Sequence, residues 1–426
     1  MTSNGTKNGS IHRPKTGIKV IVVGAGFGGL GAAIECHRNG HDVEIYEQFA
    51  ELKSLGDIIS FGPNAGRIFH RWGTAPGEVA DRMRAFSIDL RAYGFNIHKY
   101  DTGEVVINQR TPEPDRAAPN FNGHRGELHA IVYEHATVEL GIPIHLGNKI
   151  RNYFEEEGQA GIILDNGEKV AGDVVLAADG VRSKARKIVL GYEDKPKSSG
   201  YAVWRAWFTN EDMLADPETA QFCNNGDTFN GWIGPDMHLL FSTIKNGADC
   251  CWVLTHPDEH DIDESWSFPG KLSEVLEALK DWDPMCRRIV GKTPASRLVD
   301  WKLPGGAHLV VGRLAHPFLP TSAQGAAQAV EDGVTIATCL RLCGGKEHIP
   351  TAVRAHERIR YERVREAQKT GESTRDMWHK TDWDRVKDDP TVIQFPRLAW
   401  IFEHDAEKHA EKVYEEVAKQ VLTDGA

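Results

Sequence analysis

The stretch IKVIVVGAGFGGLGAAI, from Ile18 to Ile34, decides the fold of this chain. Its first six residues are an apolar, largely β-branched run, which is typical of a buried parallel strand. Gly24, Gly26 and Gly29 follow with the spacing GxGxxG. Glycines at these positions let the backbone approach a pyrophosphate, and the helix that starts here directs free N–H groups and a positive dipole end at it. The stretch predicts a phosphate-binding turn between a strand and a helix.

The residues that follow complete a βαβ unit. The helical pattern runs to about Arg38, stops at Asn39-Gly40, and a second strand spans Val43 to Tyr46. Glu47 ends that strand, 23 residues after Gly24, where dinucleotide-binding folds carry an acid for the ribose hydroxyls. A lone GxGxxG is weak evidence, but this context indicates a Rossmann-type dinucleotide site that includes Phe27 in its turn.

Composition and charge limit the kinds of partner. The chain has 426 residues, 40% hydrophobic and 26% charged, with a net charge of -11. This balance indicates a soluble globular protein and argues against nucleic acid as a partner. The apolar run after Gly17 is interrupted by five glycines, so we expect no membrane span. The seven cysteines contain no CxxC pair, which favours reduced thiols and a cytoplasmic protein over a disulfide framework or a zinc site.

The pattern along the chain predicts an α/β fold with an inserted sheet. We expect a disordered tail over residues 1–17 and a discontinuous dinucleotide-binding domain over 18–198 and 302–345. Aromatic and β-branched segments spaced like antiparallel strands fill residues 199–301 and predict a mainly antiparallel substrate-binding sheet domain. Residues 346–426 are expected to form a C-terminal helical region.

Three further segments carry candidate ligand contacts. Asp179-Gly180 follows the strand DVVLAA, at a strand end where α/β ligands collect, although an ordinary Asp-Gly turn is the alternative. Arg125, in HRGELH, lies at the start of a helix where its guanidinium can reach a phosphate; a solvated arginine is the alternative. AHPFLPTSAQGAAQAVEDG, residues 315–333, ends in a helix whose positive end would face an anionic ligand.

Together these motifs resemble the class A flavoprotein monooxygenases of para-hydroxybenzoate hydroxylase fold, over roughly residues 18 to 405. Within this family, the chain is similar to the branch of the salicylate and 6-hydroxynicotinate hydroxylases. SLGDIISFGPNAGRIFHRWG and TDWDRV…LAWIFEHDAE further resemble the fungal FAD-dependent indole monooxygenases of alkaloid pathways.

The resemblance implies FAD as bound cofactor and NAD(P)H as a transient co-substrate. It places the pyrophosphate at Gly24–Gly29, the adenosine ribose at Glu47 and support for the phosphates at Arg125. It links Asp179-Gly180 to both FAD and NAD(P)H. Pro317 and Pro320 would line the reacting face of the flavin, and Gly325 and Ala326 would present backbone N–H groups to its pyrimidine edge. A flavin C4a-hydroperoxide would then transfer oxygen to an electron-rich aromatic small molecule. The protein would act as a monomer or homodimer.

Two residues are candidates for substrate contact and catalysis, beside Pro320. Arg205, among Trp204, Trp207 and Phe208, can hold a phenolate or carboxylate, stack on a ring or assist proton delivery; an outward ion pair is the alternative. Asp57 can bind a protonated amine or an indole N–H, or cap a turn after Gly56. HPDEHDIDE, residues 256–264, fits a solvated acidic loop better than a metal site.

One residue conflicts with the resemblance. The family pattern has an aspartate after Gly312 for a flavin ribityl hydroxyl, and this chain has Arg313. Losing a charged hydrogen bond predicts about ten- to a hundred-fold weaker FAD binding. Three functions remain open: an indole-type monooxygenase, a phenol or benzoate hydroxylase of salicylate type, and a non-redox cyclase or binding protein that keeps the fold.

Overall fold

The glycine-rich turn joins the central strand of a parallel sheet to its first helix. The computed structural model describes residues 13–52, 58–112, 115–180, 183–192, 198–258, 268–304 and 318–424. β1 (Lys19–Val23) pairs in parallel with β2 (Asp42–Tyr46) on one side and β11 (Val174–Ala177) on the other. β7 (Ile144–His145) extends the sheet beyond β2. These strands confirm the predicted Rossmann-type unit.

The helix after the turn packs closely against a helix from the far end of the chain. α1 (Phe27–Arg38) lies beside α10 (Gly325–Leu342), and both helices are buried along most of their length. A Cβ atom on Gly333 of α10 would lie 2.7 Å from the backbone of Ala32 in α1, so only glycine permits this approach. α4 (Arg125–Glu134), which continues into a π-helical turn at His135–Glu139, also contacts α1.

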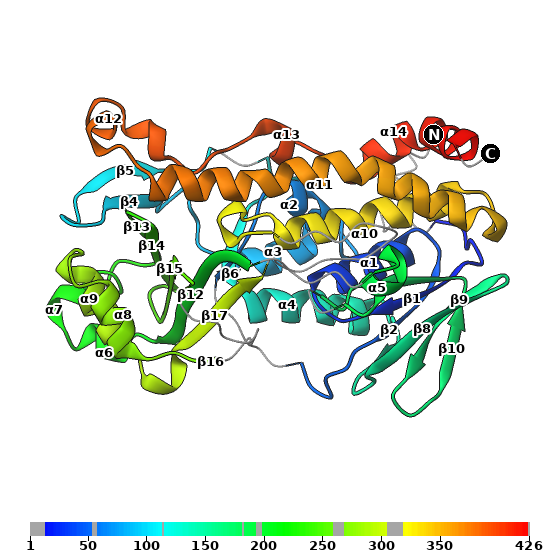
Figure 1. Cartoon of the computed structure of the whole chain (residues 1–426), viewed down its shortest axis with the longest axis horizontal. Coiled ribbons are helices and arrows are strands. Elements are labelled where there is room, and N and C mark those ends of the chain that lie inside the picture. The colour runs from blue at the N-terminus through cyan, green and yellow to red at the C-terminus, as the bar shows by residue number, and fades with distance from the viewer. Residues whose placement is uncertain are drawn as a thin grey trace, which may run out of the picture.

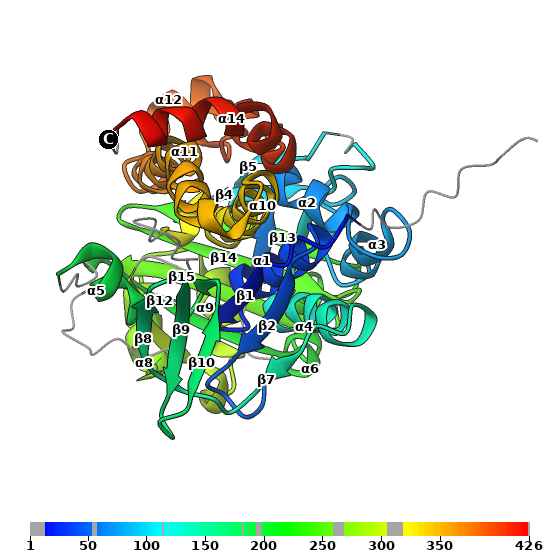
Figure 2. The same cartoon turned by 90° about the vertical axis from the view of Figure 1, so that its right-hand side faces the viewer.

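A small antiparallel sheet follows, composed of β8 (Ile150–Glu156), β9 (Gln159–Leu164) and β10 (Lys169–Gly172). Figure 2 shows it beside the parallel sheet. Gly167, with φ of +88°, makes the turn between β9 and β10, a backbone conformation that glycine adopts without strain.

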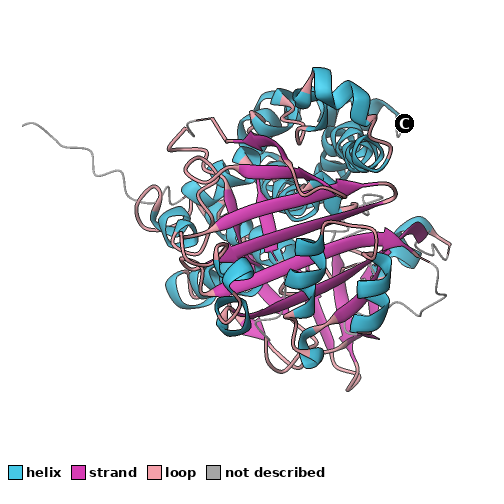
Figure 3. Cartoon of the chain, turned by 90° about the vertical axis from the view of Figure 1, so that its left-hand side faces the viewer, coloured by secondary structure: helices cyan, strands magenta, loops and turns pink. Residues whose placement is uncertain are grey.

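The second large unit is an eight-stranded sheet in the described chain (Figure 3). Its order is β16 (Phe268–Pro269), β17 (Val299–Pro304), β12 (Ser198–Thr209), β15 (Asp249–Pro257), β14 (Met237–Ile244), β13 (Thr228–Gly234), β4 (Phe95–Lys99) and β5 (Val105–Gln109). Every neighbouring pair is antiparallel except β13 and β4. The last two strands come from the segment that the sequence assigned to the dinucleotide-binding domain, so strands distant in sequence complete this sheet.

One face of this sheet is covered by two short helices. α8 (Leu272–Ala278) and α9 (Pro284–Gly291) bury Val275, Cys286 and Ile289 against Trp204 and Trp252 of the strands. The opposite face is therefore left for the remainder of the molecule.

The longest helix spans both units. α11 (Ile349–His379) has 31 residues, about 46 Å at the α-helical rise. It packs against α10 near its start and against β13 and β14 near its end (Figure 1). No helix in the described ranges is long and apolar enough to cross a membrane.

The remaining elements connect these units. They are β3 (Ile58–Phe61) paired with β6 (Phe121–His124), α2 (Pro63–His70), α3 (Glu78–Arg84), α5 (Ala185–Leu190), α6 (Glu211–Leu214), α7 (Pro217–Ala220), α12 (Trp383–Asp388), α13 (Ala399–Phe402), α14 (Ala406–Asp424) and the 3-10 turns Ala295–Arg297, Pro320–Ser322, Lys346–His348 and Pro390–Ile393.

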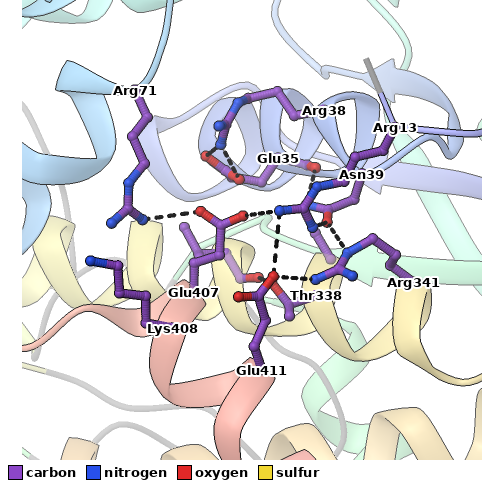
Figure 4. A network of polar contacts seen from close by, with 12 residues as sticks. Arg13, Glu35, Arg38, Asn39, Arg71, Thr338, Arg341, Glu407, Lys408 and Glu411 are labelled. Carbon is purple, nitrogen blue, oxygen red and sulfur yellow. Dashed lines mark hydrogen bonds and ion pairs between the residues drawn. The ribbon is translucent and has the colours of Figure 1, made fainter. Parts of the chain in front are cut away.

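The last helix is held by charged side chains from three segments that are distant in sequence (Figure 4). Glu407 of α14 accepts hydrogen bonds from Arg13 at 2.7 Å and from Arg71 at 3.0 Å. Glu411, one turn later, accepts from Arg341 of α10 at 2.6 Å. The last helix is thus fixed to α10, to the segment before β1 and to the end of α2.

Candidate functional site

The glycine turn has the geometry of a phosphate-binding loop. Gly24 has φ of +96°, and a Cβ there would lie 2.4 Å from the carbonyl oxygen of Ala178. A Cβ on Gly29 would lie 1.9 Å from the carbonyl oxygen of Gly24. Gly26, the N-cap of α1, has open space where its Cβ would be. Two glycines are therefore required by close packing, and the third leaves room for a ligand at the helix end.

Glu47 directly follows β2 and lies beneath this turn. Its Oε2 accepts the backbone N–H of Ala25 at 2.8 Å, and its Oε1 accepts that of Phe49 at 2.9 Å. Only 7% of the residue is exposed. The carboxylate therefore fixes the turn and retains lone pairs for further donors such as ribose hydroxyls.

His129 is a residue of this site that the sequence reasoning missed. It lies on α4, and its Nε2 is 2.6 Å from the carbonyl oxygen of Ala25. Its ring also packs edge-on against Phe27 of the turn. Burial, with Arg125 nearby, lowers the pKa of His129, so the neutral ring donates to the carbonyl. The sequence contained a signal for this residue: in HRGELH, His129 lies four residues after Arg125, on the same helix face.

Arg125 is the first residue of α4, as expected for a side chain at a helix start. His124 caps this helix by accepting the N–H of Glu127 at its Nδ1. α4 contacts α1, so the start of α4 and the glycine turn belong to the same region of the molecule.

Asp179 and Gly180 follow β11 directly. Asp179 Oδ2 accepts from the Tyr153 hydroxyl at 2.8 Å and from the backbone N–H of Lys184 at 3.3 Å. Its Oδ1 is buried without a hydrogen-bond partner, and burial raises the pKa of this carboxyl. Gly180 has φ of +80° and open space around it. An unpartnered acceptor at a strand end fits a ligand with hydroxyl or amide donors.

The amino end of α10 supplies donors of its own. Pro320 begins a 3-10 turn, Gln324 is the N-cap of α10, and Gly325 and Ala326 form its first turn. Backbone N–H groups in the first turn of a helix have no partner within the helix. The Gln324 Nε2 and Asn64 Oδ1 atoms are also buried and unpartnered here. A carbonyl- and imide-bearing ring edge, as in a flavin, fits this mixture of donors and an acceptor.

The structure separates Arg205 from two of its predicted neighbours. Alternation along β12 places Arg205 and Trp207 on one face and Trp204 and Phe208 on the other. The expectation that all three aromatics surround Arg205 is therefore wrong, because Trp204 and Phe208 pack into the core beneath α8 and α9.

The face with Arg205 is turned toward the Rossmann half. Trp207 packs against the His124 ring at the start of α4, with ring centroids 4.2 Å apart. Tyr201, also on this face, contacts His379 and Arg375 of α11. Arg205 thus lies on the sheet face between these two contacts, and not on the face covered by α8 and α9.

Some predicted residues lie outside the described ranges. They include Asp57, Gly312, Arg313 and Pro317, together with residues 259–267 of the acidic segment. Within the part of the chain that the structure describes, no group of three or more His, Cys, Asp or Glu side chains is placed to hold a metal ion.

The fold combines a Rossmann sheet, a phosphate-binding turn, an acid at the end of β2 and an inserted antiparallel sheet. This combination defines a dinucleotide-dependent enzyme of the class A flavin monooxygenase fold. A family model for an NAD(P)-binding Rossmann-like domain matches residues 22–52. The crystal structure of CtdE in complex with FAD and a substrate superimposes with a TM-score of 0.85, 34% identity, and coverage of 95% of this chain and 100% of CtdE. Salicylate hydroxylase, at 18% identity and a TM-score of 0.74, shares the fold.

Sequence relatives give the family. Asperlicin C monooxygenase of Petromyces alliaceus is 37% identical over 424 residues, covering 95% of this chain and 89% of the relative. The FAD-dependent monooxygenase fsr3 of Gibberella fujikuroi is 32% identical, covering 97% of this chain and 82% of the relative. The chain belongs to the FAD-dependent monooxygenases, and its cofactor is FAD.

Proposed function

We propose that this enzyme uses NAD(P)H and O2 to hydroxylate or epoxidise an electron-rich aromatic small molecule, with an indole alkaloid of fungal secondary metabolism as the first candidate. The observation that carries the proposal is the face of β12 turned toward the Rossmann half. It combines a cation, Arg205, with the indole ring of Trp207, which suits an aromatic substrate. Fungal relatives named as monooxygenases, with asperlicin C monooxygenase among them, support the oxygenation reaction.

The described residues would hold the cofactor at three places. The turn at Gly24–Gly29 and Arg125 would bind the phosphates, Glu47 the adenosine ribose, and the start of α10 the ring. The Asp179 Oδ1 acceptor would take a donor from FAD or from NAD(P)H. When bound, the FAD supplies activation of O2 and transfer of one oxygen atom.

The chain's own contribution is to orient the substrate and exclude water. Arg205 would hold a phenolate, carboxylate or ring and deliver a proton, while Pro320 would close the site beside the ring. Asp57 remains a predicted contact for an amine or indole N–H.

We further infer a cytoplasmic protein, since all seven cysteines are buried free thiols, as in reducing compartments.

A phenol or benzoate hydroxylase of salicylate type is the second candidate. Arg205 favours it, because a guanidinium is well suited to pair with a carboxylate or phenolate. The third candidate, a non-redox protein, loses support because the relatives that match nearly the whole chain are named monooxygenases.

The test begins with purified holoenzyme. NADH and NADPH oxidation would be followed with an indole alkaloid, indole and salicylate, under isotopically labelled O2. We expect stimulation by an indole-containing compound and incorporation of one labelled oxygen atom into it. Stimulation by salicylate alone would favour the second candidate, and labelled product from none of the aromatics would overturn the proposal.

Arg205→Ala tests the site itself. Because Arg205 would contact the substrate and not the FAD, we expect substrate-stimulated NAD(P)H oxidation to fall by about 100-fold while FAD stays bound. Thr209→Ala, an exposed position on the same face of β12, is the control and should leave turnover unchanged. Loss of FAD from the Arg205 variant would place this residue at the cofactor instead.

A further inference from the structure

A buried charged network lies directly behind the amino end of α10. Glu331 of α10 has no exposed surface, and Arg360 of α11 has 1%. Arg360 donates to Glu331 Oε2 and to Asp332 Oδ1, both at 2.6 Å. Arg363 binds both oxygens of Glu331, at 2.8 and 2.9 Å. Two carboxylates and two guanidinium groups are thus paired in the interior.

The network reaches the N-cap of α10 through one amide. Asn64 of α2 donates its Nδ2 to Glu331 Oε1 at 2.7 Å and to Gln324 Oε1 at 3.0 Å. Gln328 donates to the same Gln324 oxygen at 3.1 Å. Because Gln324 Oε1 is held by these two amides, its buried Nε2 is left as a donor without a partner. The Glu331 carboxylate is therefore connected to Gln324, the N-cap of α10, by two hydrogen bonds through the Asn64 amide.

The sign of the charge at this position matters for a ligand at the helix start. The backbone dipole places a partial positive charge at the amino end of α10. Glu331 lies six residues after Gly325, about 9 Å along the helix at the α-helical rise, so its negative charge alone would cancel that potential. Arg360 and Arg363 balance the charges of Glu331 and its neighbour Asp332. Burial alone would raise the pKa of Glu331. The nearby Arg363 and Arg360 lower this pKa by more than burial raises it, so the carboxylate is charged.

One neighbouring histidine does not change this balance at neutral pH. His404, after α13, also faces Glu331. Burial lowers the pKa of His404 to about 4, so its ring is neutral. Arg363 also donates to the backbone carbonyls of Trp400 and Ile401, which anchors this guanidinium to α13.

We propose that Arg360 and Arg363 are positioning residues that neutralise Glu331 and Asp332 and keep the amino end of α10 electropositive, which raises the reduction potential of the flavin. The inference rests on the proposed location of the flavin ring at this helix end. Two-electron reduction transfers a hydride from a nicotinamide to the ring and leaves the reduced ring with one negative charge, so positive potential at the helix end stabilises the reduced form.

The experiment measures the reduction potential of the FAD holoenzyme without substrate, against a reference dye. Arg363→Gln leaves the network with one extra negative charge and should lower the potential. Glu331→Gln leaves one extra positive charge and should raise it. Each change should alter the equilibrium constant for flavin reduction by about tenfold, as expected for a unit charge roughly 10 Å away at an effective dielectric constant of about 20.

The double variant, Glu331→Gln with Arg363→Gln, distinguishes charge from structure. Neutrality is restored in it, so its potential should return close to that of the wild type, even though both ion-pair partners are gone. Arg358→Gln is the matched control, because Arg358 is on the same helix but pairs with Asp424 at the surface. If Glu331→Gln does not fold, Arg363→Gln and the double variant still give the comparison.

Potentials that move in the same direction in both single variants, or that do not move in folded holoenzyme, would overturn the inference. So would a double variant that shifts further than either single variant. Because the measurement needs no aromatic substrate, failure to find a substrate contradicts only the proposed function. Unmoved potentials in an enzyme that oxygenates an aromatic contradict only this inference.

Discussion

At the scale of single residues, carboxylates in this protein fix backbone that a ligand must approach. Glu47 accepts two backbone N–H groups, one of them from the glycine turn. Its predicted position at the end of β2 was confirmed, while its role toward the ribose stays a prediction. The hydrogen bond to Ala25 came only from the structure, because a GxGxxG pattern does not specify which acceptor holds the loop.

Glu47→Gln is expected to raise the dissociation constant of FAD by about tenfold. The amide keeps the shape of the side chain but places an NH2 group against one of the two backbone donors and removes the charge. The measurement is a fluorescence titration of apoprotein with FAD. Glu44→Gln is the control, because Glu44 lies on β2 just before Glu47 but is paired with Lys19 and partly exposed. Equal affinities in both variants would contradict the assignment of Glu47.

At the scale of elements, the C-terminal helix is held by ion pairs rather than by sequence neighbours. Glu407 bridges Arg13, before β1, and Arg71, after α2, with only 10% of its side chain exposed (Figure 4). The helical pattern of α14 was evident in the sequence. The place where α14 docks was not evident in the sequence, because an ion-pair partner hundreds of residues away leaves no local pattern.

Glu407→Gln is expected to lower the free energy of unfolding by about 1–2 kcal/mol, since two guanidinium groups lose their shared carboxylate. The difference should shrink in 1 M salt, roughly a 3 Å Debye length, because the pairs are only partly buried. Urea unfolding at low and high salt checks both points. Glu416→Gln, exposed on the same helix, should stay within about 0.5 kcal/mol of the wild type. An equal loss at high salt would indicate packing and not charge.

At the scale of the whole molecule, α11 joins the Rossmann half to the eight-stranded sheet. At its end, His379 Nε2 lies 2.8 Å from His238 Nδ1 of β14, and Thr255 lies 3.1 Å from the other nitrogen of His238. Burial, with Arg375 nearby, lowers the pKa of His379 to about 4 from its ordinary 6.5. The contact that connects the two halves is therefore made by neutral imidazoles.

This pair predicts a loss of stability in acid. Between pH 6.5 and about 4 the unfolded chain binds a proton at His379 that the folded chain does not, so stability is full above pH 6.5 and falls as the pH is lowered. His379→Gln, whose amide does not titrate, should reduce the slope of unfolding free energy by up to about 1.4 kcal/mol per pH unit. Urea unfolding from pH 7 to 4.5 measures it. His348→Gln, at an exposed histidine, should leave the slope unchanged, and an unchanged slope in His379→Gln would contradict the prediction.

The sequence by itself determined the βαβ unit, the helix that follows Gln324 and the family, because each depends on local periodicity or on glycines at fixed spacing. It also gave Arg205 as a candidate. It did not show which neighbours share a face with Arg205, since strand alternation separated Trp204 and Phe208 from it.

Only the tertiary structure decided how distant segments combine. β4 and β5 join a sheet formed mostly by residues beyond 198, His129 supports the glycine turn from α4, and Arg360 and Arg363 neutralise Glu331 across two helices. The physical reason is common to all three. Burial makes an unpaired backbone edge, carbonyl or charge costly, and the group that satisfies it is selected by proximity in space, which no short-range pattern records.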